Sequence, residues 1–376
     1  MKNNVVIIGT GHSGGMTAIS LRKQKYNGSI SLIGEEPYLP YQRPALSKGF
    51  LAGDIEEKRL YLKSQQYFDK NNINIIPGTK VISIDRQNKT VLLDSQKEIG
   101  YERLVIATGS IVNKLKTQCG ETNLYYLRAI EDSLRIKERL KSKNKITIIG
   151  AGYIGLEIAS IAIKKNLDVT VLELEDRVMK RVVSSEVSSF FLDKHKTAGV
   201  SFKFNTAVIN IKDQGKQKRI ICDDGTVIKT NTVVIGVGIK PNVELAQDCG
   251  LECDNGIIVD DHGQTADPCI FATGDCSNHP NEIFEQRLRL ECVQNAVEQA
   301  KSVAARICGN RNPYQQVPWF WSDQYDLKLQ IAGISQNHDH RIVRGFPEEE
   351  KFAVFYLKNN RLIADDAINN PQEFTI

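Results

Sequence analysis

Two stretches of the sequence place glycines where a backbone could meet a phosphate group. They read VVIIGTGHSGG near the start and ITIIGAGYIGLE in mid-chain, and both have G-x-G-x-x-G spacing. The glycines are Gly9, Gly11 and Gly14 in the first stretch and Gly150, Gly152 and Gly155 in the second. Each stretch follows a short apolar run and opens a helical pattern, so the glycines allow a tight turn, close approach of a pyrophosphate and helix-on-strand packing. The phosphates would lie at the positive end of a helix dipole. Two such loops predict a chain that holds two dinucleotides and passes electrons between them.

An acidic residue ends the strand that follows each loop. Glu35 follows the predicted strand 29–33, with Glu36 as the neighbouring alternative, and Glu173 follows the strand 169–172. A carboxylate at this point can accept hydrogen bonds from ribose hydroxyls. At Glu173 it favours NADH over NADPH, because it repels a 2′-phosphate. Arg177 could accept that phosphate, whereas Glu175 adds negative charge, and we predict NADH.

The elements that carry these residues occur twice in the same order. The first half predicts a strand at 5–8, a glycine turn, a helix, a strand, an acid, short antiparallel strands over 73–99, and a strand ending in Ala107-Thr108-Gly109. The second half repeats this plan and ends in a strand followed by Gly236 and Gly238. This duplication predicts an α/β fold with two Rossmann-like dinucleotide-binding domains.

The rest of the chain completes this plan and adds a third part. A short strand at 270–272 ends near Gly274-Asp275, where an aspartate could bind a polyol such as a ribityl chain, and a helix is predicted over 291–308. From Pro318 the sequence reads PWFWSDQY and continues as alternating strands. We therefore predict a discontinuous first domain (1–111 and 241–317), a second domain (112–240) and a small C-terminal α+β domain (318–376).

Composition narrows the class of protein. The 376 residues carry a net charge of only +4, with 41% hydrophobic and 25% charged residues, which is typical of a soluble globular protein and too mild a charge to favour nucleic acid. The sequence shows no run long enough to span a bilayer and no secretory signal at MKNN, so we expect a cytoplasmic protein without a membrane partner. The eight cysteines are spread out and complete no zinc set, so we expect no metal.

The order of the motifs resembles a known family. GTGHSGG, RPALSKGFLAGD, ERLVIATGS, GAGYIGLE, ADPCIFATGDC and PWFWSDQY follow one another as in the FAD-dependent NADH:ferredoxin and rubredoxin reductases of oxygenase systems. The resemblance covers essentially the whole chain and implies the glutathione reductase-like fold, with FAD as cofactor and NADH as substrate. Members usually continue past the NNPQEF stretch into a final helical segment, so the C-terminal domain is short relative to the family.

The resemblance also implies the site residues. Gly9, Gly11, Gly14 and Glu35 would hold the adenosine half of FAD, and the backbone of Val81 would meet the adenine. The other expected FAD contacts are Arg43, Pro44, Lys48, Ala107, Thr108, Gly109, Arg128, Gly274, Asp275, Val293 and Trp321. The NADH site would be formed by Gly150, Gly152, Tyr153, Ile154, Gly155, Glu157, Glu173, Arg177, Gly236 and Gly238.

Three residues would act in catalysis. Glu157 lies one turn into the helix after the second loop, and in the family pattern it pairs with a lysine at the position of Lys48, although a purely structural ion pair is the alternative. Trp321 would lie against the flavin ring. No cysteine precedes Cys119, so the nucleophile of disulfide reductases is missing.

Electrons would therefore leave as single electrons to a transiently bound ferredoxin or rubredoxin that serves an oxygenase. An NADH oxidase and a flavin redox sensor resembling apoptosis-inducing factor are the alternatives. The protein would be a monomer or a homodimer.

Overall fold

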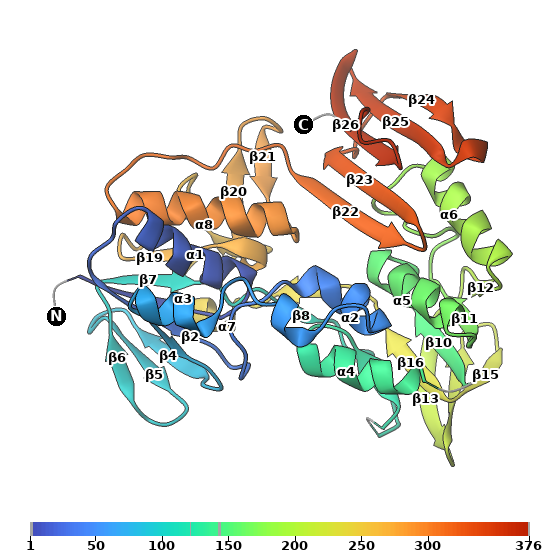
Figure 1. Ribbon diagram of the computed structural model, residues 1–376, viewed down its shortest axis with the longest axis horizontal. Coiled ribbons are helices and arrows are strands. Elements are labelled where there is room, and N and C mark those ends of the chain that lie inside the picture. Colours follow the sequence, from blue (N-terminus) through green and yellow to red (C-terminus); the bar gives the residue numbers. More distant parts are fainter. Residues whose placement is uncertain (1–2, 121, 142–143, 375–376) are drawn as a thin grey trace. The chain divides into compact units, whose positions relative to one another are not determined.

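The computed structural model describes residues 3–120, 122–141 and 144–374 (Figure 1). Within them the chain divides into two compact units, each made of three segments. The first unit takes the described parts of Met1–Arg43, Glu57–Ile111 and Lys240–Pro318, and the second those of Pro44–Glu56, Val112–Ile239 and Trp319–Ile376. Residues 44–56 thus belong to the second unit, although the sequence-based domain division, which stays a prediction, places them in the first domain.

A five-stranded parallel sheet organises the first unit. Its strand order is β19-β7-β1-β2-β3. The bounds are β1 Asn4–Ile8, β2 Ser29–Ile33, β3 Ile73–Ile76, β7 Arg103–Ile106 and β19 Ile270–Ala272. Both faces of β1 are buried, which explains its unbroken apolar sequence. The prediction that 73–99 is wholly antiparallel is wrong at its start, because β3 pairs in parallel with β2 at the edge of this sheet.

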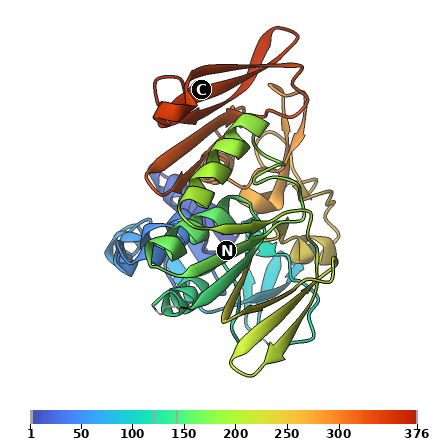
Figure 2. The same cartoon turned by 90° about the vertical axis from the view of Figure 1, so that its right-hand side faces the viewer.

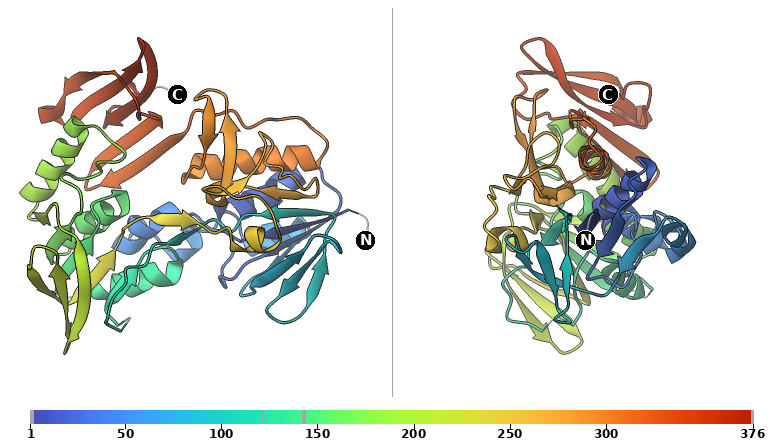
Figure 3. Two further views of the ribbon diagram at one scale, coloured as in Figure 1. Left: turned by 180° about the vertical axis from the view of Figure 1, so that it is seen from behind. Right: turned by 90° about the vertical axis from the view of Figure 1, so that its left-hand side faces the viewer.

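Helices cover one face of this sheet and a small antiparallel sheet covers the other. Val5 and Ile7 pack towards α1 (His12–Lys23) and α8 (Val293–Ile307), which lie side by side (Figures 1 and 3). Val6 and Ile8 share the opposite core with residues of a three-stranded meander. The meander consists of β4 Val81–Asp85, β5 Thr90–Leu93 and β6 Glu98–Gly100. This arrangement leaves the carboxyl end of β1 to lead into the first glycine loop.

The second unit repeats the plan. Its parallel sheet has the order β12-β11-β10-β16-β9. The bounds are β9 Leu124–Tyr126, β10 Lys145–Ile149, β11 Asp168–Leu172, β12 Ser201–Lys203 and β16 Thr232–Ile235. Helix α5 (Tyr153–Lys164) follows β10 as α1 follows β1. A meander of β13 Val208–Gln214, β14 Gln217–Cys222 and β15 Val227–Thr230 shares a core with β10 and β16. The two Rossmann-like domains of the predicted fold class are confirmed.

A five-stranded antiparallel sheet, also part of the second unit, ends the described chain. Its order is β22-β23-β26-β25-β24. The bounds are β22 Trp319–Gln324, β23 Leu327–Gly333, β24 His340–Phe346, β25 Lys351–Lys358 and β26 Arg361–Ile368. Helix α6 (Ser185–Thr197) packs against this sheet (Figure 2). The rings of Phe190 and Phe352 lie 5.1 Å apart. The sequence analysis did not predict β22, whose PWFWSDQ sequence lacks a clear alternation.

The remaining elements are short or connect these layers. In the first unit they are α3 Gln65–Lys70, α7 Glu244–Asp248, β18 Ile257–Ile258, β20 Ser277–Asn281 and β21 Gln286–Leu288. In the second they are α2 Gly49–Ala52 and α4 Ile130–Arg139. Strands β8 Ser110–Val112 and β17 Ile239–Pro241 each contain a point at which the chain passes from one unit to the other. Among the described residues, no helix combines the length and the apolar character that a membrane crossing requires.

Candidate active site

The first glycine loop is held in shape by backbone contacts that exclude a side chain. Gly9 has φ +110°, and a Cβ there would lie 2.2 Å from the Ala107 carbonyl oxygen. A Cβ on Gly14 would lie 1.9 Å from the Gly9 carbonyl oxygen. Gly11 differs, because its nearest neighbour is the Arg43 guanidinium at 3.9 Å. The first and third glycines are therefore needed for packing, and the second leaves open space in front of the N-terminus of α1.

The second loop repeats this geometry closely. Gly150 has φ +103°, and a Cβ on it would lie 2.4 Å from the Gly236 carbonyl oxygen. A Cβ on Gly155 would lie 2.1 Å from the Gly150 carbonyl oxygen, whereas one on Gly152 meets no atom within 4 Å. Each loop thus offers an open cradle at a helix N-terminus, which suits a pyrophosphate group.

The two acids after β2 have different surroundings. Glu36 is bonded within the protein, because it accepts a hydrogen bond from Tyr41 Oη at 2.5 Å and pairs with Arg43. The side chain of Glu35 is 74% exposed, with Lys80 Nζ 4.0 Å away. The carboxylate of Glu35 is therefore the freer of the two to accept hydrogen bonds from a ribose.

His12 is a residue of the first loop that the sequence analysis missed. Its Nδ1 is buried without a hydrogen-bond partner among the described residues. Burial lowers the pKa of His12 to about 4, with Asp275 opposing the shift and Arg43 adding to it. A neutral, unpartnered imidazole beside the open Gly11 indicates a ligand at this position. Its place between the second and third glycines was the signal that could have identified it.

The strand ends opposite this loop supply the remaining predicted contacts of the first unit. Thr108 Oγ1 donates to the Asn242 carbonyl oxygen at 2.6 Å, and Gly109 has φ +69°. Asp275 accepts a hydrogen bond from Ser110 Oγ at 2.7 Å. Gly274 has φ +81°, and its N–H donates to Gln299 Oε1 at 2.7 Å. These bonds hold the strand ends in fixed conformations.

Other predicted FAD contacts are spread along both units. Val81 begins β4 and is buried, and Val293 is the first residue of α8. Pro44, Lys48, Arg128 and Trp321 belong to the second unit. Trp321 is half-buried on β22, with its ring centroid 5.6 Å from that of Trp319.

Glu157 is a buried carboxylate of the second unit with three side-chain partners. Its side chain is 2% exposed, and its Oε1 lies 2.7 Å from Lys48 Nζ. Two hydroxyls donate to it: Ser47 Oγ to Oε2 at 2.5 Å and Ser322 Oγ to Oε1 at 2.6 Å. Burial raises the pKa of Glu157, and Lys48 and both serines oppose that rise. The predicted Lys48–Glu157 pair is present, whereas the serines were missed because 110 and 165 residues separate them from Glu157.

Glu173, the predicted ribose-binding acid, accepts hydrogen bonds from backbone N–H groups of the second loop and of its own turn. Glu173 Oε2 accepts from the Ala151 N–H at 2.5 Å, and Oε1 accepts from the Glu175 N–H at 3.0 Å. Arg177 is engaged elsewhere, because its guanidinium donates to the carbonyl oxygens of Val183, Ser184 and Lys180 at 3.0–3.1 Å. The arginine that could have favoured a 2′-phosphate is thus held against the backbone of the following loop.

Aromatic and small residues make up the remaining predicted NADH contacts. The Tyr153 ring packs against Phe320 with centroids 4.7 Å apart, and Ile154 is 43% exposed. Gly236 N–H donates to the Ile149 carbonyl oxygen at 2.8 Å, and Gly238 has φ +94°. All predicted NADH contacts lie within the second unit.

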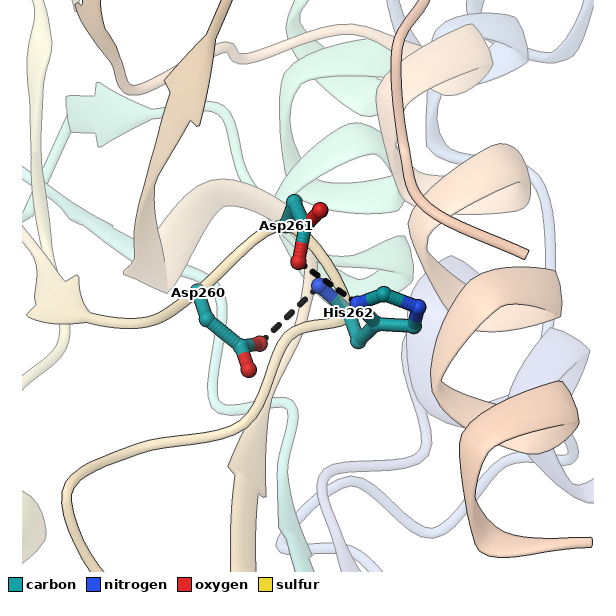
Figure 4. A group of neighbouring side chains, drawn as sticks. All are labelled: Asp260, Asp261 and His262. Carbon is teal, nitrogen blue, oxygen red and sulfur yellow. Dashed lines mark hydrogen bonds and ion pairs between the residues drawn. The ribbon is translucent and has the colours of Figure 1, made fainter. Parts of the chain in front are cut away.

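One cluster of possible metal ligands lies apart from the glycine loops in the sequence. Asp260, Asp261 and His262 form a turn in which Asp260 accepts from the His262 N–H and Asp261 pairs with the ring at 2.5 Å (Figure 4). Asp260 also accepts from the Gln264 N–H at 2.8 Å. Asp260 and Asp261 thus use carboxylate oxygens to shape the turn, and the arrangement is that of an ordinary polar turn.

The fold and these loops define an oxidoreductase with two dinucleotide sites. The model of the pyridine nucleotide-disulphide oxidoreductase family matches residues 3–300, and that of the reductase C-terminal family matches residues 319–376. The chain therefore belongs to the pyridine nucleotide-disulphide oxidoreductase family.

Relatives within this family are similar over nearly the whole chain. Putidaredoxin reductase of Pseudomonas putida is 40% identical over 99% of this chain and 90% of its own. Rhodocoxin reductase of Rhodococcus erythropolis is 41% identical over 98% of this chain and 87% of its own. The solved covalent putidaredoxin reductase–putidaredoxin complex matches with a TM-score of 0.96 at 40% identity, covering 99% of this chain and 91% of that one. The resemblance found in the sequence is thus confirmed, and the chain is an FAD-dependent oxidoreductase that uses NADH.

Proposed function

We propose that this protein takes electrons from NADH onto FAD and passes them singly to a ferredoxin or rubredoxin that serves an oxygenase. Three relatives in the comparisons are named for such carriers, namely putidaredoxin, rhodocoxin and, in P. putida, rubredoxin, the last at 37% identity over 98% of this chain. When bound, the flavin accepts a hydride and gives up its electrons one at a time.

The observation that carries this proposal is the set of unused bonding positions at Lys48 and Glu157. An ionised carboxylate offers about four acceptor positions. Lys48, Ser47 and Ser322 occupy three of them, one of which lies on Oε2. Lys48 donates one hydrogen bond to Glu157, and its other donors have no partner among the described residues.

These unused positions match a carboxamide, which has an N–H to donate and a carbonyl oxygen to accept. We infer that Glu157 Oε2 accepts from the nicotinamide amide and that Lys48 donates to its oxygen. Because both groups are held by the protein before the substrate arrives, they orient the nicotinamide at little additional entropic cost. Exclusion of water from this buried pair strengthens both contacts.

Thiol chemistry does not compete with this route in the first domain. The chain has no cysteine before Cys119, and burial raises the pKa of Cys276 and Cys253, in the second case to about 11. Thiols with raised pKa values are poor nucleophiles. The same absence speaks against NADH oxidases that rely on an early cysteine.

Stopped-flow and steady-state kinetics test the proposal. The FAD-loaded protein should be reduced by NADH in the absence of carrier, and a [2Fe–2S] ferredoxin or rubredoxin should increase cytochrome c reduction at least tenfold. Oxygen consumption without carrier should remain slow. Fast oxygen consumption that no carrier accelerates would instead establish an NADH oxidase. We propose the cytoplasm as the location, because NADH is available there.

A further inference from the structure

A chain of hydrogen bonds leads from Glu157 through the second unit to the loop that joins β22 and β23. Ser322 Oγ lies 2.6 Å from Glu157 Oε1, and Gln324 Nε2 lies 3.2 Å from Ser322 Oγ. Gln324 Oε1 lies 2.9 Å from His195 Nε2, and His195 Nδ1 lies 2.9 Å from Tyr325 Oη. Ser322, Gln324 and His195 are all completely buried.

The direction of these bonds follows from the chemistry of each group. Gln324 Oε1 can only accept, so His195 Nε2 must carry a hydrogen. The neutral imidazole then accepts at Nδ1 from the Tyr325 hydroxyl. Gln324 donates to Ser322, which leaves the single hydroxyl hydrogen of Ser322 for Glu157. Every donor in the chain therefore points towards Glu157.

This series of hydrogen bonds stabilises the negative charge of Glu157 and fixes the position of the carboxylate, but it does not conduct protons. The amide of Gln324 stands between His195 and Ser322, and an amide does not readily pass a proton on. His195 also stays neutral at physiological pH, because burial lowers its pKa to about 4. A row of aligned donors, by contrast, favours a negative charge at its end, since hydrogen bonds to an anion stabilise the anion.

Tyr325, the member of this series farthest from Glu157, also contacts α5, the helix that carries Glu157. Lys164, in the last turn of α5, donates to the Tyr325 carbonyl oxygen at 3.1 Å and lies 5.9 Å from the centre of its ring. Helix α5 therefore contacts the β22–β23 hairpin at Ser322 and again at Tyr325. Helix α6 holds His195 between them.

We propose that His195 and Gln324 are positioning residues that fix the Ser322 hydroxyl as a donor to Glu157 and so keep this carboxylate ionised and correctly oriented for the nicotinamide. The inference rests on the proposed function only in the part that assigns Glu157 to the nicotinamide. The effect on Glu157 itself is independent of turnover.

The charged and titratable groups around the two ends are few. Lys48, at the start of α2, and Tyr153, on α5 itself, face Glu157, and Asp366 on β26 interacts with Tyr153. Tyr325 faces His195, and the neighbouring Lys194 is paired with Glu350. Burial raises the pKa of the Asp366 carboxyl to about 7, so the test must separate its titration from that of Glu157.

The test replaces the two inner members of the chain. Gln324→Met removes the donor that orients Ser322, and His195→Leu removes the donor that fixes the Gln324 amide; both roughly keep the side-chain volume. Ser322 is then no longer held as a donor, and loss of its hydrogen bond to the carboxylate should raise the pKa of Glu157 by about one unit. The acid limb of the rate of flavin reduction by NADH should therefore move up by about one pH unit in both variants.

Infrared spectroscopy gives a readout that does not depend on turnover. The band of the protonated Glu157 carboxyl, assigned by its loss in Glu157→Gln, should appear about one pH unit higher in both variants than in the native protein. The same comparison in an Asp366→Asn background removes the band of the buried Asp366 carboxyl, whose pKa is also raised by burial. His195→Gln, which can place a donor near the position of Nε2, should restore the native midpoint.

A matched packing variant separates positioning from general loosening. Phe191→Leu changes another fully buried residue of α6 and should lower stability without moving the midpoint. Unchanged infrared midpoints in both His195→Leu and Gln324→Met would overturn the inference. If one of them does not fold, the other decides the outcome. Shifted midpoints with an unshifted rate profile would leave the positioning intact and reject the role of Glu157 at the nicotinamide.

Discussion

At the scale of single residues, burial and hydrogen bonding have opposite effects on the pKa of Glu157. Burial raises its pKa, and Lys48, Ser322 and Ser47 oppose that rise. A carboxylate in this condition is sensitive to each partner, because the loss of one leaves a buried charge that is incompletely compensated.

Replacement of Lys48 by alanine should slow the reduction of flavin by NADH at least tenfold, which corresponds to about 1.4 kcal/mol. The physical reason is the loss of the cation, which raises the pKa of Glu157 further and removes a donor for the carboxamide. Stopped-flow absorbance at the flavin band measures the rate. Lys165→Ala is the control, since Lys165 donates to the Ala52 carbonyl oxygen from an exposed position and should leave the rate unchanged. An equal rate in Lys48→Ala would reduce the pair to a structural role.

Replacement of Glu173 by arginine should shift coenzyme preference towards NADPH by at least tenfold in the ratio of kcat/KM values, because the acid that repels a 2′-phosphate becomes a cation. Arg177→Ala is the matched comparison. Its guanidinium binds three carbonyl oxygens, so its loss should reduce thermal stability and leave the preference unchanged. A raised preference for NADH in Arg177→Ala would show that Arg177 accepts the 2′-phosphate and would contradict this assignment.

At the scale of elements, two glycines of the second loop have different tasks: one allows close backbone packing and the other leaves space for the pyrophosphate. Gly155→Ala should lower stability by about 1–3 kcal/mol, because its Cβ would lie 2.1 Å from the Gly150 carbonyl oxygen and force the backbone apart. Gly152→Ala should fold normally, since a Cβ there meets no atom within 4 Å.

The same Gly152→Ala variant should raise KM for NADH at least tenfold, because the new methyl group fills the cradle for the pyrophosphate. Thermal unfolding and steady-state kinetics measure the two effects separately. Equal losses of stability in Gly152→Ala and Gly155→Ala would show that the cradle is occupied by the protein itself.

The C-terminal sheet holds a carboxyl group that links its stability to pH. Asp366 is fully buried on β26, accepts from Tyr356 Oη at 2.5 Å and has a pKa raised to about 7 by burial. Because the folded state binds this proton more tightly than the unfolded state, the contribution of Asp366 to stability is fully present below about pH 4 and is lost as pH rises to about 7. The imidazoles of His12 and His195, whose pKa values burial lowers to about 4, act in the opposite direction. Urea unfolding of the FAD-loaded proteins should therefore show that the native protein loses stability relative to Asp366→Asn as pH rises over this range. Parallel pH profiles of the two proteins would contradict the raised pKa of Asp366.

At the scale of the whole molecule, the protein must release electrons to a partner that binds briefly. Trp321→Ala should lower kcat/KM for a ferredoxin or rubredoxin about tenfold, while ferricyanide reduction by NADH stays within about twofold, because large aromatic residues contribute most to small redox interfaces. Trp319→Phe is the control, since Trp319 packs on Phe374 with centroids 6.3 Å apart and phenylalanine keeps that contact. An equal loss with both acceptors would place Trp321 in the NADH half-reaction.

Much of the fold and of the site could be predicted from local sequence. A glycine turn after an apolar strand is determined by backbone conformation over six residues, so both loops and the acids after β2 and β11 were found. The duplicated order of elements then predicted the two parallel sheets. The edge strand β3 was misassigned, because a short apolar strand has the same pattern in a parallel and an antiparallel sheet.

Contacts between distant segments could not be predicted in this way. The sequence by itself determined that two dinucleotides bind and that Glu157 follows the second loop, because these features depend on near neighbours along the chain. Only the tertiary structure decided how Glu157 keeps its charge. Ser47 and, on β22, Ser322 donate to it directly, while Gln324 on β22 and His195 on α6 are linked to it through Ser322. Hydrogen bonds between side chains 110–165 residues apart leave no periodic signal in the sequence.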